Sequence, residues 1–503
     1  MKNLKKVFAI AGSIIAVAVI AVLIVLFAKK GPSKVAIDKT TPQTYLNGVL
    51  KNGLSETSKE FSDQFAKVFK GVDFKNFKTT SNVKLNFTPT FYSIVNPMAG
   101  IELDSVKSIG LTTSVERKKD ASGLLYRLGL NDVELATVDV RLNNNKMYIE
   151  APGVLTKGFI LNDAAKQGLD LGTFTKMYDL VDFYMELLGS TGSRYLSTAT
   201  KYVDILVNAD SKVTFINDKY GQTAFDWTLD GQTMKNFLIE FLSDVKKDKK
   251  LLKDVQAALE VLEKFAGSEI ADFNNEEMVQ NIDGIIEEVK EIDASEIPDC
   301  LYTISINSED KVTGMSFVFE DLISGNFYLI PEKNIFSCNL SVDIDGDLIS
   351  LNGNGKISDT IFDGEFVVSS DGKDVMTFGF EGFDFEKNNG KFIFGNFNPE
   401  MDDIFPYFSV MKIVFDVKSA SIKQSQADIL VTIADKEFIT GNYTTEISKS
   451  DGINIPTKDV ELIEDVNTLS QNIMNYIDLT ALMDNLQKTG CADLIAQLFG
   501  GMF

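Results

Sequence analysis

Two long stretches of the chain alternate apolar and polar residues with a period of two, which is typical of β-strands with one buried face. The first stretch runs from about Thr79 to Glu150, and the second from Cys300 to about Ile447. We predict an antiparallel meander in each. The pair Asn131-Asp132 predicts a turn in the first meander. In the second, dipeptides that favour a left-handed backbone predict the tight turns between strands; they are Asp345-Gly346, Asn352-Gly353, Asn354-Gly355, Asp363-Gly364, Asp371-Gly372 and Asn389-Gly390.

Helical periodicity surrounds the two meanders. Thr57 to Glu60 has the pattern of a capping box and predicts the start of a leading helix. Apolar residues spaced by three and four predict a helical insertion at about 173–291 and a helical tail over 456–503. Within the insertion, the alternation of Phe225, Trp227 and Leu229 predicts a hairpin. We therefore expect an α+β fold, in which a large antiparallel β-meander sheet occupies an ectodomain over residues 46–455.

The N-terminus predicts a membrane anchor. Val7 to Ala28 is apolar or small throughout, and at about 1.5 Å per residue it spans the roughly 30 Å core of a bilayer. The run is longer than the apolar region of a cleaved signal peptide and ends in Lys29-Lys30, which is a poor cleavage site. We predict a single-pass cell-membrane protein with an anchor over residues 1–34, a stalk over 35–45 and an extracytoplasmic C-terminal domain.

Composition excludes several functional classes. Lys and Arg total 49 against 72 Asp and Glu, so the net charge is −23, which argues against a nucleic-acid partner. Histidine is absent, which removes Ser-His-Asp and Cys-His catalysis and two-histidine zinc motifs. The three cysteines Cys300, Cys338 and Cys491 have no metal-ligand spacing. A disulfide between Cys300 and Cys338 is one reading, and buried free thiols are the one we favour.

No motif assembles a catalytic or metal site, and we expect neither an enzyme nor a cofactor. Ser81, Ser308 and Ser370 are each followed by a lysine three residues later, as in penicillin-recognising enzymes, but none of them opens a helix. The alternating Asp343, Asp345 and Asp347 lack the glycine and glutamate positions of a calcium loop. We interpret them as a solvated hairpin.

Aromatic residues are the feature with functional potential. They are concentrated in the second meander, and one reading is an ordinary packed core. The other is a cavity that binds an apolar ligand. The candidate lining residues are Phe378, Phe380, Phe392, Phe394 and Trp227.

The order of leading helix, meander, inserted helices and second meander resembles the LolA/LppX-like family over about Leu46 to Ile447. That resemblance implies a strongly curved, half-barrel-like sheet with helices on its concave side, and an acyl chain bound in the cavity. This chain departs from the family by its uncleaved anchor, its missing lipobox cysteine and its additional helices. The expected function is thus binding or handling of a lipid in the cell envelope. The alternatives are a structural or interaction ectodomain without a ligand and, third, a cell-wall enzyme.

Overall fold

The computed structural model describes residues 36–69, 73, 75–119, 121–143, 146–162, 201–208, 210–253, 256, 275–320, 323–330, 333–344, 346–358, 360–384, 386–403, 405–421, 423–456, 460–463, 473–491 and 494. Their strands belong to one 20-stranded sheet that is not closed, and helices accompany it, so the predicted α+β class is confirmed. The chain divides into two compact units. Unit 1 holds Met1–Val68 and Phe183–Gly379, and unit 2 holds Phe69–Asp182 and Phe380–Phe503.

Unit 1 contains consecutive antiparallel strands, each hydrogen-bonded to the next along the chain from β7 to β14. The strands are β7 (Lys212–Asn217), β8 (Thr223–Leu229), β9 (Cys300–Ile306), β10 (Val312–Phe319), β11 (Ile323–Ile330), β12 (Ile335–Ile344), β13 (Asp347–Ser358) and β14 (Ile361–Ser370). The next strand, β15 (Lys373–Asp384), crosses the boundary between the units.

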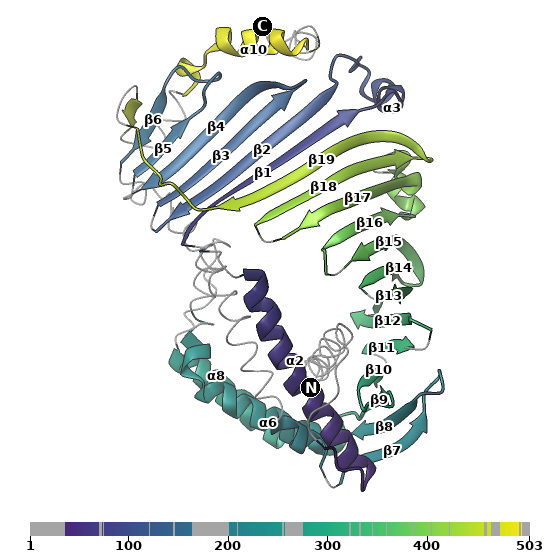
Figure 1. The fold of residues 1–503 in the computed structure, drawn as a ribbon. Helices are drawn as coiled ribbons and strands as arrows, with labels where there is room; N and C mark the ends of the chain where they lie inside the picture. Colours follow the sequence, from purple (N-terminus) through teal and green to yellow (C-terminus); the bar gives the residue numbers. More distant parts are fainter. Residues whose placement is uncertain are drawn as a thin grey trace. The chain divides into compact units, whose positions relative to one another are not determined.

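Helices α2 (Pro42–Phe69), α6 (Gly231–Lys247) and α8 (Asn275–Glu291) lie on one side of these strands (Figure 1), and the short 3-10 helix η3 (Ala294–Glu296) follows α8. They cover an apolar core in which Phe225 and Ile304 are fully buried and Trp227 is 2% exposed. The Trp227 ring stacks on Tyr302 at 5.0 Å between centroids. Burial of such large side chains is the main stabilising contribution in unit 1.

Helix α2 begins earlier than the sequence pattern predicted. The predicted capping box at Thr57 lies inside the helix, and residues 42–45 of the predicted stalk are helical. The actual cap is Thr41, because its hydroxyl accepts a hydrogen bond from the backbone of Thr44 at 3.1 Å, and the Thr44 hydroxyl accepts one from the backbone of Thr41 at 3.2 Å. Pro42 then occupies the first helical position, where its missing N–H costs nothing.

Three of the predicted turn dipeptides are strand interiors. Strands β13 and β14 run through Asn352-Gly353, Asn354-Gly355 and Asp363-Gly364. The glycines there make room for aromatic rings from neighbouring strands: a Cβ on Gly353 would lie 2.2 Å from a carbon of Phe366, and one on Gly355 would lie 2.3 Å from a carbon of Phe336. Glycine in a strand marks close approach as well as turns.

Unit 2 combines two segments that are far apart in the sequence, Phe69–Asp182 and Phe380–Phe503. Its strand order, from hydrogen-bonded neighbours, is β16-β17-β18-β19-β1-β2-β3-β4-β5-β6-β20. The strands are β1 (Asn76–Phe87), β2 (Ser108–Lys118), β3 (Ala121–Leu130), β4 (Val133–Asn143), β5 (Lys146–Glu150), β6 (Gly158–Leu161), β16 (Asn389–Gly395), β17 (Met411–Ala420), β18 (Gln424–Ile433), β19 (Lys436–Ser448) and β20 (Val460–Ile463).

Two-residue turns join several of these antiparallel strands. Asn131 and Asp132 have φ of 50° and 64° between β3 and β4, which confirms the turn predicted there. In unit 1, a turn of the same kind joins β14 to β15, where the predicted Asp371 and Gly372 have φ of 51° and 76°. Ala434 and Asp435 form the equivalent turn between β18 and β19, which the sequence did not predict because alanine seldom adopts positive φ.

Three helical features complete unit 2. Helix α3 (Pro89–Ala99) interrupts the first meander and was not predicted. The short 3-10 helices η4 (Pro399–Asp403) and η5 (Phe408–Val410) lie between β16 and β17, and η6 (Ile473–Tyr476) precedes α10 (Leu479–Thr489). The predicted helical tail is wrong at Val460–Ile463, which pairs as a parallel strand with β6. Val460 and Ile463 are β-branched, and the edge of β6 offers them backbone partners.

Two other predictions concern the anchor and the thiols. No helix among the described residues is long and apolar enough to cross a membrane, and the predicted anchor Val7–Ala28 lies outside those residues. All three cysteines are free, so Cys300 and Cys338 do not pair. Cys300 and Cys491 are buried as expected, whereas Cys338 is partly exposed.

Candidate functional site

The sheet of unit 2 has one apolar and one polar face, because residues on a strand alternate in direction. On β2, Ile109 and Leu111 point to one face and Thr112 and Ser114 to the other. The register aligns Leu111 with Leu128 and Thr112 with Arg127 on β3. Neighbouring strands therefore continue both faces across the sheet.

The polar face contains a pocket of about 380 Å³ between β1–β4 and the segment around Ile453. The volume lies within the range of small-molecule sites, about 300–1,000 Å³. Its charged lining residues are Lys78, Arg127, Arg141, Glu116 and Asp139. Thr80, Thr112 and Ser114 add hydroxyl groups, so the pocket carries both hydrogen-bond donors and acceptors.

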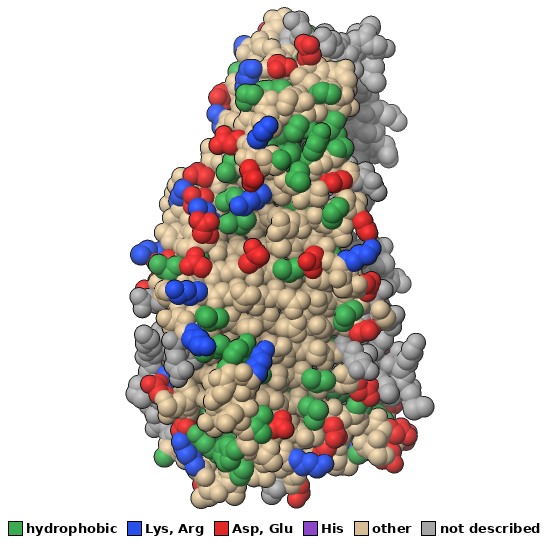
Figure 2. Space-filling view, turned by 90° about the vertical axis from the view of Figure 1, so that its right-hand side faces the viewer, with side chains coloured by type: hydrophobic (Ala, Val, Ile, Leu, Met, Phe, Trp, Pro, Cys, Tyr) green, Lys and Arg blue, Asp and Glu red, His purple; other side chains and the backbone are tan. Residues whose placement is uncertain are grey.

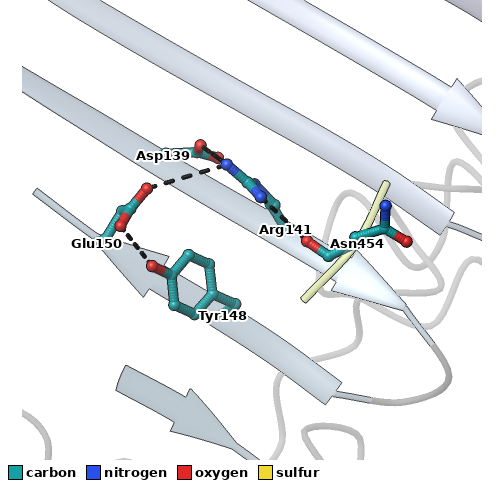
Figure 3. A network of polar contacts seen from close by, with 5 residues as sticks. All are labelled: Asp139, Arg141, Tyr148, Glu150 and Asn454. Carbon is teal, nitrogen blue, oxygen red and sulfur yellow. Dashed lines mark hydrogen bonds and ion pairs between the residues drawn. The ribbon is translucent and has the colours of Figure 1, made fainter. Parts of the chain in front are cut away.

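Asp139, Arg141 and Asn454 form one wall of this pocket and belong to a network of polar contacts that also includes Tyr148 and Glu150 (Figure 3). The Arg141 guanidinium donates hydrogen bonds to the Asp139 carboxylate through Nε and one terminal nitrogen, and Nε lies 3.2 and 3.1 Å from the two carboxylate oxygens. It also donates to the backbone carbonyl of Asn454 at 3.0 Å. Glu150 lies 3.9 Å from the guanidinium and accepts a hydrogen bond from the Tyr148 hydroxyl. The network thus ties the 450–454 segment to strands β4 and β5.

These contacts determine the charge states of Arg141 and Tyr148. The hydrogen bond to Asp139 raises the pKa of Arg141 above its usual value, so the guanidinium stays charged. Burial raises the pKa of the Tyr148 hydroxyl, and the hydrogen bond to Glu150 raises it further. The tyrosine therefore remains neutral at physiological pH, and we assign the wall a structural role.

The apolar face exposes a patch that we call the β2–β4 apolar patch. Its members lie on three adjacent strands and are 37–44% exposed: Ile109, Leu111, Tyr126, Leu128 and Val138. Leu111 aligns with Leu128, and Tyr126 aligns with Val138, so the side chains are neighbours rather than isolated. Contiguous exposed apolar surface of this kind marks interaction or ligand-binding sites more often than scattered single residues do.

The five predicted aromatic lining residues do not form one group. Trp227 lies in the packed core of unit 1, under α2 and α6. Phe378 stacks on Phe366 at 4.9 Å within unit 1. In unit 2, the rings of Phe380 and Phe392 lie 5.0 Å apart, and Phe394 lies 6.1 Å from Phe415.

Phe392 and Phe394 share a face with the β2–β4 apolar patch. Phe392 aligns with Phe415, Phe415 with Ile429 and Ile429 with Gly441. Gly441 aligns with Leu85, which in turn aligns with Ile109 of the patch. The apolar face of unit 2 therefore runs continuously from β16 to β4.

The weaker motifs stay apart from one another. The Ser81 hydroxyl lies 2.9 Å from that of Thr445 on the sheet. Asp343 accepts the backbone N–H of Gly346 at 2.8 Å in the β12–β13 hairpin, while Asp345 lies outside the described residues. The described part of the chain contains no cluster of metal-ligating side chains.

Sequence reasoning missed the polar pocket. Lys78, Thr112 and Asp139 are polar positions of ordinary alternating strands, and nothing in their local pattern separates a pocket from a solvated face. One signal was available: of the four arginines in the chain, Arg117, Arg127 and Arg141 fall within a short stretch of the first meander.

Charge elsewhere is dispersed. Figure 2 shows acidic and basic side chains interspersed on one face of the molecule, with hydrophobic side chains in small groups. That face carries no large patch of a single charge, although the chain as a whole is strongly acidic.

Comparisons with known proteins do not assign the chain to a class. No protein-family model and no curated protein sequence matches it. Among solved structures, the crystal structure of OpdQ from Pseudomonas aeruginosa aligns over 74% of this chain and 96% of that chain, at 6% identity and a TM-score of 0.13. A likeness that weak supports no conclusion about fold or function, so the two faces of unit 2 are what a functional argument can use.

Proposed function

We propose that this protein is a membrane-anchored, extracytoplasmic protein of the cell envelope that binds a lipid acyl chain on the apolar face of unit 2. The observation that carries the proposal is the β2–β4 apolar patch, whose five large side chains are 37–44% exposed on adjacent strands. Full burial of one such side chain stabilises by about 1.5–3 kcal/mol. A ligand that covers the patch recovers part of that free energy.

An acyl chain fits the chemistry of this surface. The register partners Leu111 and Leu128 offer hydrocarbon, and the aromatic rings of Phe392 and Phe394 extend the same face. The charged side chains and hydroxyl groups of the polar pocket lie on the opposite face. The Ser81 and Thr445 hydroxyls, which lie on the apolar face, hydrogen-bond to each other at 2.9 Å. The ligand is therefore recognised by apolar contact along its length.

The wider setting of the proposal comes from the sequence. The Val7–Ala28 run supports a retained anchor with the domain outside the cytoplasm. The resemblance to LolA/LppX-like proteins supports a strongly curved sheet with helices on its concave side and an apolar ligand. Both belong to the proposal.

The lipid test uses the full-length chain in membranes and a photoactivatable fatty acid. We expect crosslinks on peptides from residues 108–138, identified by mass spectrometry. Replacing Leu111 and Leu128 together by Asp should reduce labelling of those peptides by about tenfold or more, since each tenfold corresponds to about 1.4 kcal/mol.

A matched control is available in unit 1. Leu301 and Val318 are also register partners, and they are 51% and 44% exposed, but polar residues surround them. Replacing this pair by Asp should leave labelling of residues 108–138 unchanged. Equal losses in both double variants, or no labelling of the native chain at residues 108–138, would contradict lipid binding and leave an interaction ectodomain as the better account.

The topology test is separate. The intact chain should remain with membranes after carbonate washing, and external protease should digest the domain on intact cells stripped of their wall. Protection from that protease would reverse the proposed orientation.

A further inference from the structure

The polar pocket of unit 2 contains two basic side chains, Lys78 and Arg127, that have donor groups without a partner within the described part of the chain. Lys78 lines the pocket and, within the described part of the chain, its ammonium has no ion-pair partner. Arg127 forms an ion pair through Nε with Glu134 at 2.9 Å, and its two terminal nitrogens donate no hydrogen bond within the described residues. Hydrogen-bond donors that line a pocket and have no partner in the protein can bind a ligand there.

Lys78 is unpaired for a specific reason. Glu116 is its register partner on β2 and would be its natural counter-ion. However, the Glu116 carboxylate accepts the Ser450 hydroxyl at 2.6 Å, which turns it toward the 450–454 segment. The Arg141 charge, by contrast, is held by Asp139. Lys78 and Arg127 therefore provide the available positive charge on the pocket floor.

The acceptors of the lining restrict the ligand further. Glu116 and Asp139 would repel a ligand that carries only negative charge, but they can accept hydrogen bonds from hydroxyl groups. The Thr80 and Ser114 hydroxyls, 3.3 Å apart, can donate or accept. The lining thus suits a molecule with one anionic end and hydroxyl groups along the rest.

We propose that this pocket binds a small, water-soluble polyol that carries one oxyanion group, a carboxylate or a phosphate. Lys78 and Arg127 hold the oxyanion, and the hydroxyl and carboxylate groups of β1 and β2 hold the polyol. The site is distinct from the proposed lipid surface, because its side chains point to the opposite face of the same sheet. It does not depend on the lipid proposal.

The experiment uses the full-length chain in phosphatidylcholine nanodiscs and isothermal titration with glycerol 3-phosphate, glycerate, inorganic phosphate and glycerol. We expect saturable binding of glycerol 3-phosphate, of glycerate or of both, at least about tenfold tighter than glycerol. Comparison of the two anions decides between phosphate and carboxylate. Lys78→Gln should weaken binding by about tenfold or more, because a hydrogen bond to a charged group is lost.

Two control variants separate the site from general charge effects. Lys418→Gln removes a positive charge from the same sheet face, but Lys418 is paired with Asp416 at 2.6 Å and lies outside the pocket lining, so binding should not change. Lys78→Arg keeps the charge and should retain binding, which guards against a failure of Lys78→Gln to fold. Lys78→Gln should also leave fatty-acid labelling intact, so the two proposals can fail independently.

Several outcomes would overturn the proposal. These are no saturable binding of either organic anion in the millimolar range, equal binding by the native chain and Lys78→Gln, or glycerol binding as tightly as the anions. Nanodiscs that contain phosphatidylglycerol test for a lipid headgroup instead. Competition from that lipid without any binding of the soluble anions would also contradict a soluble ligand.

Discussion

In unit 1, Phe225 and Ile304 are fully buried beneath helices, whereas in unit 2 Leu111 and Leu128 on equally regular strands are each 41% exposed. Most of the largest fully buried side chains among the described residues belong to unit 1, and Phe159 and Leu161 represent unit 2. The strands of both units alternate in the same way. The difference lies in whether helices such as α2 and α6 cover the apolar face. Alternation therefore defines a face but not what covers it.

We expect the largest difference in the free energy of unfolding between truncation of a core residue in unit 1 and truncation of a residue of the β2–β4 apolar patch in unit 2. Ile304→Ala should lower the free energy of unfolding of unit 1 by about 2–5 kcal/mol, because it leaves a cavity in a packed core. Trp227 is the single tryptophan of the chain and lies in that core, so its fluorescence during chemical denaturation reports unit 1.

The unit 2 counterpart is Leu128→Ala, which removes atoms that are already partly in water. It should change stability by less than about 1 kcal/mol. Hydrogen exchange of the β3 amides in the native protein and in Leu128→Ala measures this change in stability. If the two substitutions had equal effects, the contrast between a covered and an uncovered face would be wrong.

A smaller effect is expected at strand glycines. Gly355→Ala in unit 1 places a Cβ 2.3 Å from both a Phe336 carbon and the backbone oxygen of Asp363, which cannot move independently. Overpacking of this kind should cost about 1–3 kcal/mol. Gly110→Ala in unit 2 meets only the Val83 carbonyl at 3.9 Å and should be tolerated. Thermal unfolding of the two variants compares them, and equal destabilisation would argue against the aromatic cover over Gly355.

A third comparison stays within unit 2. Asp139→Asn should lower stability by about 1–2 kcal/mol, because Asp139 is 7% exposed and its charge holds Arg141. Asp416→Asn breaks the more exposed pair with Lys418 and should cost less than about 1 kcal/mol. Hydrogen exchange in β4 and β17 measures both, and high salt should reduce only the Asp416 effect appreciably. An Asp139→Asn variant as stable as the native protein would remove the structural role assigned to the pocket wall.

The smallest effect concerns the thiols of unit 1. Burial raises the pKa of Cys300 to about 11 from an ordinary value of 9.0, so at pH 8 its thiolate fraction is about a hundredfold lower than that of a free thiol. Cys338 is partly exposed, and iodoacetamide should alkylate it faster. Peptide mass spectrometry of the native protein measures the order, and preferential labelling of Cys300 would contradict its burial.

The same pKa predicts an alkaline effect on stability. Above pH 9 the unfolded thiol ionises while the folded thiol keeps its proton, so the Cys300 contribution is complete below pH 9 and is lost between pH 9 and about 11. Replacing Cys300 by Ala should flatten this part of the pH profile. If the free energy of unfolding of that variant fell with pH as steeply as in the native protein, groups other than Cys300 would cause the alkaline loss of stability.

The sequence supported the two meanders because strand alternation and turn chemistry are local. Asn131-Asp132 is a turn and was predicted as one, since its backbone preference needs no partner. Gly355 was misassigned because its role depends on the Phe336 ring from a neighbouring strand. Val460–Ile463 became a strand because the β6 edge was available, which no local pattern around residue 460 reveals.

The candidate surfaces were predictable to different degrees. Phe392 and Phe394 were identified as apolar lining residues, and they do lie on the continuous apolar face of unit 2. Trp227 follows the same alternation, yet α2 and α6 bury it in a core. The pocket around Lys78 and Arg127 was missed because it depends on the 450–454 segment, more than 300 residues away, crossing the polar face.

The pairing of β1 with β19 has a consequence for how the protein is made. Ser81 and Thr445 contact one another across 364 residues of chain. A ribosome that adds about 5–20 residues per second needs about 20–70 s to produce the intervening segment. Throughout that time β1 has no partner on its β19 side, and an open strand edge can pair with other chains. The growing chain is therefore most vulnerable to aggregation long after β1 to β6 have been synthesised, and every premature stop before residue 436 leaves that edge permanently open.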